Sequence, residues 1–282
     1  MSLSNQQPYG FLPFVTQAGA EVTYLAQFAE KGGSPIRAYK ALSFDLLALQ
    51  PGLTVLDVGC GLGDDLAILA GQVGPRGQVF GLERNPDLAQ LARERLAALT
   101  NVQVWVGDAE QMPFADAQFD RARADRVLQH TPAPARVLAE MHRVLRPGGI
   151  LTAIEPDWKT LALYPASPAG ADRDEILIQV LEYYQRHLAH ALIGRQLQAL
   201  LAQQGTAAWA AWQVQAIALT LTTWAPVDAV LQLTTAAQAL AQERPHLARE
   251  IEMWLQAVNA ADARGEFLAT MPLFFASARK VS

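Results

Sequence analysis

Three glycines at the end of a predicted strand are the first residues in this sequence that could do chemistry. Residues 53–58 predict a buried strand, and it runs directly into Gly59, Gly61 and Gly63. Glycine lets the backbone turn sharply and leaves room for a ligand against the main chain. The helix expected to follow would direct its N-terminal N–H groups at that ligand. This turn is therefore predicted to be a ligand-binding loop.

Carboxylates next to the glycines decide which ligand the loop can take. A dinucleotide site needs a glycine at position 64, where this chain has Asp64, followed by Asp65. Two carboxylates at a helix N-terminus disfavour a phosphate group, and Asp57 adds a third negative charge facing the loop. The ligand is therefore expected to carry positive charge and no phosphate.

Two further acids fit the same ligand. Glu83 ends the next predicted strand, where a carboxylate can accept both hydroxyl groups of a ribose. Asp108 follows the third strand and can accept from the amino group of an adenine, while the N–H of Ala109 donates to the ring. An adenosine with a cationic tail and no phosphate is S-adenosylmethionine. This is the predicted cofactor, with S-adenosylhomocysteine as its product.

The elements that position these residues alternate between short β-like runs and helical runs, which is typical of a parallel sheet covered on both faces. The strands expected in this half are residues 53–58, 78–83, 102–106, 119–124 and 150–155. Asn85 and Pro86 predict the start of one helix, and Thr131 and Pro132 predict the start of another. Residues 147–149, Pro-Gly-Gly, are expected to stop the second helix.

Five motifs lie within roughly residues 40–155, namely VLDVGCGLG (55–63), VFGLERN (79–85), GDAEQMPF (107–114), FDRARADRVLQH (119–130) and LRPGGIL (145–151). Their order and spacing resemble the class I S-adenosylmethionine-dependent methyltransferases. The resemblance is strongest to the small-molecule branch, which includes the ubiquinone and menaquinone biosynthesis C-methyltransferases. One departure is the charged fourth strand, where we expect Arg121 and Arg123 to face one way and Ala122 and Ala124 the other.

The resemblance implies an α/β fold: a Rossmann-like, seven-stranded, mostly parallel sheet with an antiparallel last strand, plus helical lid insertions. The glycine loop would pass under the methionine part of the cofactor, and the backbone near Ala124 and Asp125 would meet its amino acid end. The implied cofactor site comprises Asp57, Gly59, Cys60, Gly61, Gly63, Glu83, Arg84, Gly107, Asp108, Ala109, Glu110, Ala124 and Asp125.

The chain is predicted to have a cofactor-binding core at residues 51–156, with lid segments around it. Residues 1–50 are expected as N-terminal helices that cover the cofactor. Residues 157–282 would complete the sheet and insert helical lid segments at about 172–204 and 226–263. Five of the six tryptophans lie in this last part, and most of them are expected in the core.

Within the second half, Gly194 is expected to interrupt the first helical segment. The second segment is expected as two helices, 226–242 and 246–263. Residues 209–224 and 267–280 predict the last two strands, which form an antiparallel pair at the sheet edge in the family.

Methyl transfer needs a nucleophile in line with the sulfonium, about 3 Å away, in a site that excludes water. An acceptor hydroxyl or acidic carbon also needs a base, and histidine is the usual choice. His130 is at the exit of the fourth strand, beside the expected methyl group, and is the catalytic candidate, although a purely structural role stays open. Gln129, Asp157 and Trp158 flank the same opening. No metal site is expected.

Composition excludes several other classes of protein. The 282 residues include 22 Lys and Arg against 27 Asp and Glu, a net charge of −5, which argues against a nucleic-acid partner. No Asn-Pro-Pro-aromatic group, which would hold a flipped amino base, follows the fourth strand. The single cysteine excludes a disulfide framework and a cysteine-based zinc site. The start of the chain does not resemble a signal peptide, which predicts a soluble, cytoplasmic protein with no membrane partner.

The expected activity is O- or C-methylation of a small, largely apolar or aromatic metabolite, in a monomer or a homodimer. Two alternatives stay open. The same fold and cofactor site could serve a non-methylating reaction, or the protein could bind the cofactor without catalysis. Residues 156–282 do not distinguish among acceptors, nor N-methylation from the other two reactions.

Overall fold

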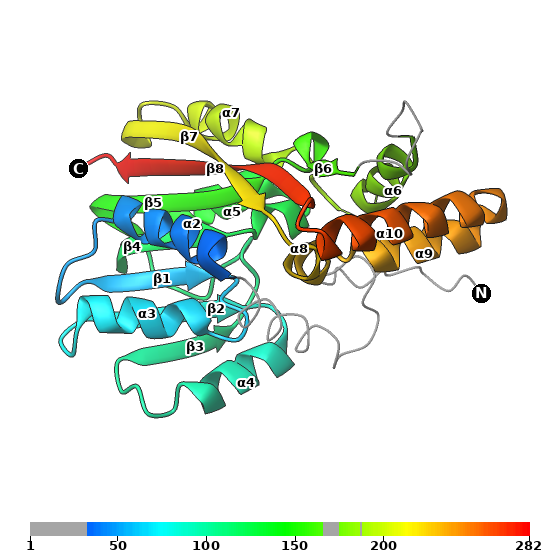
Figure 1. The fold of residues 1–282 in the computed structure, drawn as a ribbon. Helices are drawn as coiled ribbons and strands as arrows, with labels where there is room; N and C mark the ends of the chain where they lie inside the picture. The colour runs from blue at the N-terminus through cyan, green and yellow to red at the C-terminus, as the bar shows by residue number, and fades with distance from the viewer. Residues whose placement is uncertain (1–32, 166–174, 187) are drawn as a thin grey trace, which may run out of the picture.

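The computed structural model describes residues 33–165, 175–186 and 188–282 (Figure 1). Its sheet has the strand order β3-β2-β1-β4-β5-β8-β6, and β7 also pairs with β8. Strands β1 to β5 are parallel, whereas β8 is antiparallel to β5, β6 and β7. The strands are β1 (Thr54–Val58), β2 (Gln78–Glu83), β3 (Val102–Val106), β4 (Phe119–Asp125), β5 (Leu145–Pro156), β6 (Ala162–Tyr164), β7 (Trp209–Leu221) and β8 (Leu268–Lys280).

Helices cover both faces of the sheet and extend beyond the carboxyl ends of its parallel strands (Figure 1). One face carries α2 (Gly33–Leu46), α3 (Asp64–Val73) and α4 (Pro86–Arg95), and the other carries α5 (Pro134–Val144) and α7 (Ile193–Gln204). The helices beyond the sheet are α6 (Glu175–Gln185), α8 (Trp224–Leu231), α9 (Leu233–Glu243) and α10 (Ala248–Ala263). Three short 3-10 helices are η1 (Leu128–His130), η2 (Trp158–Thr160) and η3 (Pro245–Leu247).

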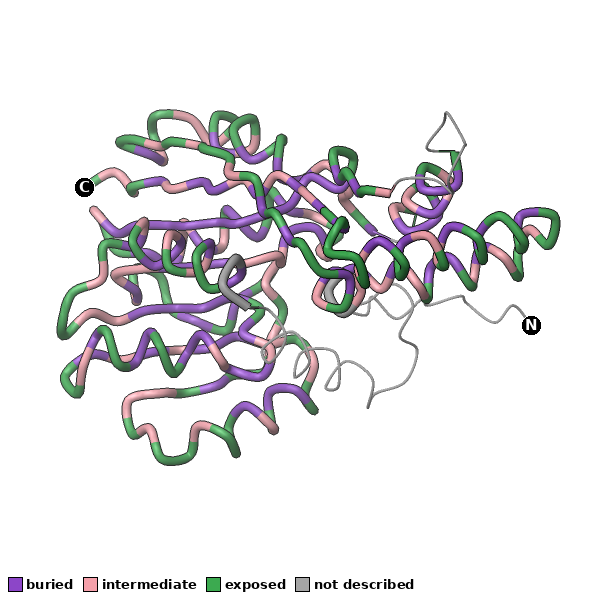
Figure 2. Tube along the Cα trace, viewed as in Figure 1, coloured by how far each residue is buried: buried purple, intermediate pink, exposed green. Residues whose placement is uncertain are grey.

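Buried residues follow the central strands and the inner sides of the helices (Figure 2). Strand β4 fits this pattern in spite of its charges, and its side chains alternate between the two faces as predicted. Ala122 and Ala124 are fully buried in the cluster that contains α5. Arg121 and Arg123 point to the opposite face, where their Nε atoms donate to Leu47 O and to Ser43 Oγ.

The five strands of the first half are confirmed, and four of them agree with the prediction to within one residue at each end. β5 begins five residues earlier than expected, at Leu145, so residues 147–149 lie in the strand and do not stop the helix, which ends at Val144. The start of α4 is also confirmed: Asn85 Oδ1 accepts the N–H of Asp87 at 2.9 Å, and Pro86 is the first helical residue. The helix predicted from Thr131 begins later, at Pro134. The sheet has one strand more than the seven expected, because residues 162–164 pair with β8.

The second half differs more from expectation. The first helical segment is divided into two helices as expected, and the second ends before Gly205. The position of the break is wrong, because α6 ends at Gln185 and Gly194 lies in the first turn of α7. The helix expected over 226–242 is divided at Gln232, whose φ is +50°. The edge pair of β7 and β8 is confirmed. Residues 1–32, from the predicted N-terminal cover, and residues 172–174, the start of the predicted lid segment, lie outside the described residues.

Candidate functional site

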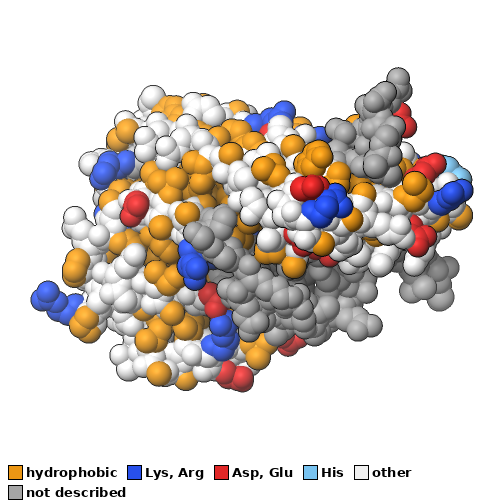
Figure 3. Space-filling model, viewed as in Figure 1, with side chains coloured by type: hydrophobic (Ala, Val, Ile, Leu, Met, Phe, Trp, Pro, Cys, Tyr) orange, Lys and Arg blue, Asp and Glu red, His pale blue; other side chains and the backbone are white. Residues whose placement is uncertain are grey.

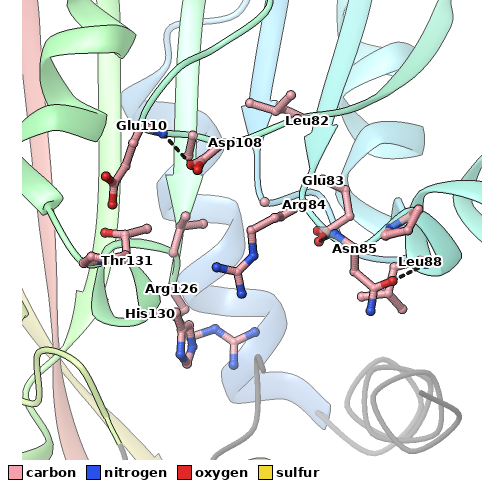
Figure 4. Close-up of a pocket in the computed structure, with 16 residues that line it drawn as sticks. Leu82, Glu83, Arg84, Asn85, Leu88, Asp108, Glu110, Arg126, His130 and Thr131 are labelled. Atoms are coloured by element: carbon pink, nitrogen blue, oxygen red, sulfur yellow. Dashed lines mark hydrogen bonds between the residues drawn. The ribbon is translucent and has the colours of Figure 1, made fainter. Parts of the chain in front are cut away.

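Two neighbouring cavities lie at the carboxyl ends of the parallel strands, where α/β folds bind ligands. The main cavity has a volume of about 600 Å³ and the inner cavity about 60 Å³. Their walls share Gly59, Glu83, Leu88 and Arg126, so the two volumes are adjacent. Figure 4 shows the main cavity, with side chains from β2, the loop after β3 and the segment after β4 around it.

The glycine loop forms the wall between β1 and α3. Gly59 and Gly63 have φ angles of +69° and +80°, which strain any residue with a Cβ. A Cβ at Gly59 would lie 2.6 Å from Val127 Cγ2, and a Cβ at Gly63 would lie 2.6 Å from Leu96 Cδ1. Both glycines are therefore required by the backbone and by packing, and Gly63 lines neither cavity.

Two carboxylates project into the main cavity from β2 and from the loop after β3 (Figure 4). Glu83 accepts the N–H of Gly61 at Oε2 (3.0 Å) and the N–H of Asn85 at Oε1 (2.9 Å). Asp108 Oδ1 accepts the N–H of Glu110 at 2.8 Å. These bonds help to fix both carboxylates in place at the cavity wall.

A buried ion network lies beneath the inner cavity. The guanidinium of Arg123 contacts Asp57 (2.9 Å), Asp65 (3.1 Å) and Asp125 (2.8 Å), and Lys40 Nζ lies 2.7 Å from Asp65. Burial raises the pKa of Asp57 to about 6, although Arg123 opposes this. Burial also acts to raise the pKa of Asp65, but Arg123 and Lys40 outweigh it and the pKa is lowered.

This network corrects the sequence interpretation of the loop acids. Asp57 and Asp65 were expected to present negative charge to the ligand, but Arg123 and Lys40 already neutralise them. Asp64 is paired with Arg95, 2.5 Å away, on a partly exposed surface. The preference for a cationic ligand therefore does not follow from these three acids.

The segment after β4 is held in place by β5. Arg126 has a φ of +59°, an uncommon conformation for a side chain of its size, and its N–H donates to Ile154 O at 2.8 Å. The buried Glu155 accepts the next two N–H groups, those of Val127 (2.8 Å) and Leu128 (2.6 Å), at Oε1. The end of β5 thus fixes where Arg126 and His130 lie.

His130 lies beside Arg126 on the wall of the main cavity (Figure 4). Burial, together with the charges of Arg126 and Arg84, lowers the pKa of His130 to about 3. The imidazole is therefore neutral at neutral pH but a weak proton acceptor. This argues against the role of general base and favours a role in which His130 orients the acceptor through a hydrogen bond.

Most of the predicted site residues are brought together. The main cavity is lined by Gly59, Glu83, Arg84, Gly107, Asp108, Ala109, Glu110 and His130, and the inner cavity by Asp57, Gly59, Cys60, Gly61, Glu83 and Asp125. Ala124 does not line either cavity, because its side chain is buried toward α5. Lys40 and Arg126 also line these cavities, although neither was predicted as a site residue.

The three weaker candidates lie behind the wall of the main cavity. Trp158 Nε1 donates to Gln129 Oε1 at 2.5 Å, and both side chains are buried. Asp157 accepts the N–H of Lys159 and is paired with Arg195. None of the three lines the main or the inner cavity, so they support the site from outside.

The predicted lid is only partly in the expected place. Helix α7, which belongs to the segment 172–204, packs on β5, β7 and β8 as part of the sheet layers. No described residue of 172–204 or 226–263 lines the main or the inner cavity. Four tryptophans are buried in the hydrophobic clusters, which confirms that most are core: Trp158, Trp209, Trp224 and Trp254.

Among the described residues there is no cluster of three or more metal-ligating side chains. No helix in the same part of the chain has the length and apolar character to cross a membrane.

Sequence comparison identifies relatives of this chain. The model of a methyltransferase domain family matches residues 49–205. An uncharacterized 37.1 kDa protein in transposon TN4556 of Streptomyces fradiae is 41% identical over 193 residues, 66% of this chain and 52% of that protein. Demethylmenaquinone methyltransferase of Staphylococcus epidermidis is 38% identical over 116 residues, 41% of this chain and 48% of that enzyme. The chain thus spans about half the length of these curated relatives.

Comparison of structures finds the same fold. Phosphoethanolamine N-methyltransferase 2 of Haemonchus contortus, in complex with S-adenosyl-L-methionine, superimposes with a TM-score of 0.59 at 18% identity. The match covers 97% of this chain and 60% of that one.

Proposed function

Because this chain belongs to the class I S-adenosylmethionine-dependent methyltransferases, we propose that it transfers a methyl group from S-adenosylmethionine to a small metabolite. The observation that carries the proposal is that Glu83 and Asp108 lie on the wall of one cavity together with Gly59 of the glycine loop. Carboxylates that accept hydrogen bonds from hydroxyl and amino groups, beside a backbone that leaves room for a ligand, suit an adenosine.

The main and inner cavities fit this cofactor. A volume of about 600 Å³ is within the range of small-molecule sites. Glu83 would hold the ribose hydroxyls, because its carboxylate ends β2 at the cavity wall and carboxylate oxygens accept hydrogen bonds from hydroxyl groups. Asp108 and the N–H of Ala109 would hold the adenine, and the loop at Gly59 and Gly61 would lie against the methionine part.

The cofactor supplies an activated methyl group on a sulfonium. The chain's own part is to bind the acceptor, orient it and exclude water. Leu88, Val127 and Pro132 in the main cavity wall support a small, largely apolar or aromatic acceptor. His130, neutral and at the same wall, would orient the acceptor through one hydrogen bond. The proposal includes a cytoplasmic location and no nucleic-acid partner.

Titration calorimetry with S-adenosylhomocysteine and with NAD tests the proposal. S-adenosylhomocysteine is expected to bind, and more tightly than NAD. Glu83→Ala should weaken its binding by roughly 1.5–3 kcal/mol, the scale of a hydrogen bond to a charged group. Glu94→Ala, which removes a carboxylate from the exposed side of α4, should leave the affinity unchanged. Tighter binding of NAD, or an unchanged affinity in Glu83→Ala, would refute the cofactor assignment.

A further inference from the structure

A second large cavity, here called the lateral cavity, lies next to residues 129–132, three of which line the main cavity. Its volume is about 620 Å³, and none of its lining residues lines the main or the inner cavity. His190, which lines it, donates its N–H to Gln129 O at 3.2 Å, and its Nε2 lies 3.3 Å from Pro132 O. The two cavities are therefore neighbours with a hydrogen-bonded wall between them.

Positive charge is in excess around the lateral cavity, although the whole chain is acidic. Among the described residues, three cationic side chains line it, Lys159 from η2, Arg186 after α6 and Arg244 after α9, together with one carboxylate, that of Glu182. Lys159 forms no ion pair with any described residue. Arg186 and Arg244 share one more distant carboxylate, Glu243 Oε1, at 3.6 and 3.7 Å. Arg244 Nη1 also donates to Gln179 Oε1 at 3.3 Å, and the guanidinium of Arg186 lies over the ring of Tyr183. One shared carboxylate at this distance leaves both guanidinium groups able to bind an anion.

Neutral polar groups complete the lining. Gln179, Gln185 and Gln196 contribute amides from α6 and α7. Gln185 Nε2 donates to Trp158 O at 2.9 Å, whereas its buried Oε1 has no hydrogen-bond partner among the described residues. A buried acceptor without a donor is costly in free energy.

We propose that the lateral cavity is a binding site for a small organic anion. Lys159, Arg186 and Arg244 would hold its carboxylate or phosphate, because guanidinium groups match the geometry of both. The glutamines would bind its hydroxyl or amino groups, and Leu188 and Leu192 provide an apolar side for its carbon skeleton. This site is separate from the cofactor cavities and does not depend on the proposed methyl transfer.

Calorimetry on the full chain with citrate and with inorganic pyrophosphate tests the proposal, since the two probes distinguish a carboxylate site from a phosphate site. At least one probe is expected to bind with a stoichiometry of one, and more weakly as salt screens the charges. Lys159→Gln and Arg244→Gln should each weaken binding at least tenfold. Arg76→Gln removes the same charge from the exposed turn between α3 and β2, and should have no effect.

S-adenosylhomocysteine serves as the second readout. Its affinity should be the same in wild type, Lys159→Gln and Arg244→Gln, which also shows that the variants are folded. The anion should bind equally well when S-adenosylhomocysteine is present at saturation. Competition between the two ligands would place the anion in the main cavity and overturn the proposal. So would the absence of saturable binding of both probes, or an equal loss of binding in Arg76→Gln.

Discussion

Arg123 and Asp57 form a buried ion pair, with Nη1 of Arg123 2.9 Å from Oδ1 of Asp57 and the two side chains 1% and 4% exposed. The pair joins β4 to β1 directly below the glycine loop. Asp65 and Asp125 contact the same guanidinium, so one arginine compensates several carboxylates. Removing one partner of a buried pair leaves an uncompensated charge, which costs more than the pair itself contributes.

Arg123→Leu is therefore expected to lower the free energy of unfolding by about 3–5 kcal/mol. Urea denaturation followed by circular dichroism measures this. Arg146→Leu is the matched control, because Arg146 is 48% exposed and its pair with Asp120 should contribute less than about 1 kcal/mol. Equal stability of the two variants would show that Arg123 does not organise the site.

Gly194 lies where the start of α7 meets the end of β5. A Cβ at this position would lie 2.8 Å from the carbonyl oxygens of Glu155 and Pro156 and from Phe274 Cδ2. Gly194→Ala should therefore cost roughly 1–3 kcal/mol of unfolding free energy, as overpacking does.

Gly71 provides the opposite case on α3. A Cβ there would have no neighbour within 4 Å, so Gly71→Ala should stabilise the protein by up to about 1 kcal/mol. Thermal unfolding of both variants checks the pair of predictions. A stabilised Gly194→Ala would mean that α7 is not held this closely against β5.

The first half of the fold could be predicted because its signals are local. Apolar runs end in glycine, and Asn85-Pro86 begins a helix by capping it, so strand and helix ends follow from the sequence. The second half depends on packing between distant segments. Gly194 was interpreted as a helix break, but its conformation is helical and its small size is needed against Glu155 and Pro156.

The site was predictable in its outline and not in its charge balance. Glu83 and Asp108 follow strands, and the carboxyl ends of parallel strands meet at one edge, so their convergence follows from topology. The roles of Asp57 and Asp65 were misjudged because Lys40 on α2 and Arg123 on β4 are distant in sequence. The charged strand 121–126 was the available signal, since a buried strand with arginines needs acidic partners.

Glu155 is expected to make stability depend on pH. Its burial raises the pKa from an ordinary value of about 4.5 to about 8, so the folded state keeps a proton that the unfolded chain releases. The contribution of this group to the free energy of unfolding is therefore fully present below about pH 4.5 and is lost as pH rises toward 8.

Glu155→Gln should remove this dependence, because the amide keeps an acceptor for the N–H groups of Val127 and Leu128 and does not titrate. Unfolding temperatures of wild type and variant at pH 5, 6, 7 and 8 measure it. With each increase in pH, the unfolding temperature of the variant is expected to rise relative to that of wild type. If the unfolding temperatures of the two proteins changed with pH in parallel, Glu155 would be ionised in the folded protein.

His130 is expected to stay neutral well into the acid range. Burial and the charges of Arg126 and Arg84 lower its pKa to about 3, whereas an unfolded histidine takes up a proton near pH 6.5. The folded state therefore loses stability from this group as pH falls from 6.5 toward 3. Nuclear magnetic resonance of histidine-labelled protein, with His130→Gln to assign the signal, follows the ring directly. Its shifts should not change between pH 8 and pH 5. A midpoint between pH 6 and 7 would instead make His130 a competent proton acceptor at neutral pH and restore the general-base role predicted from the sequence.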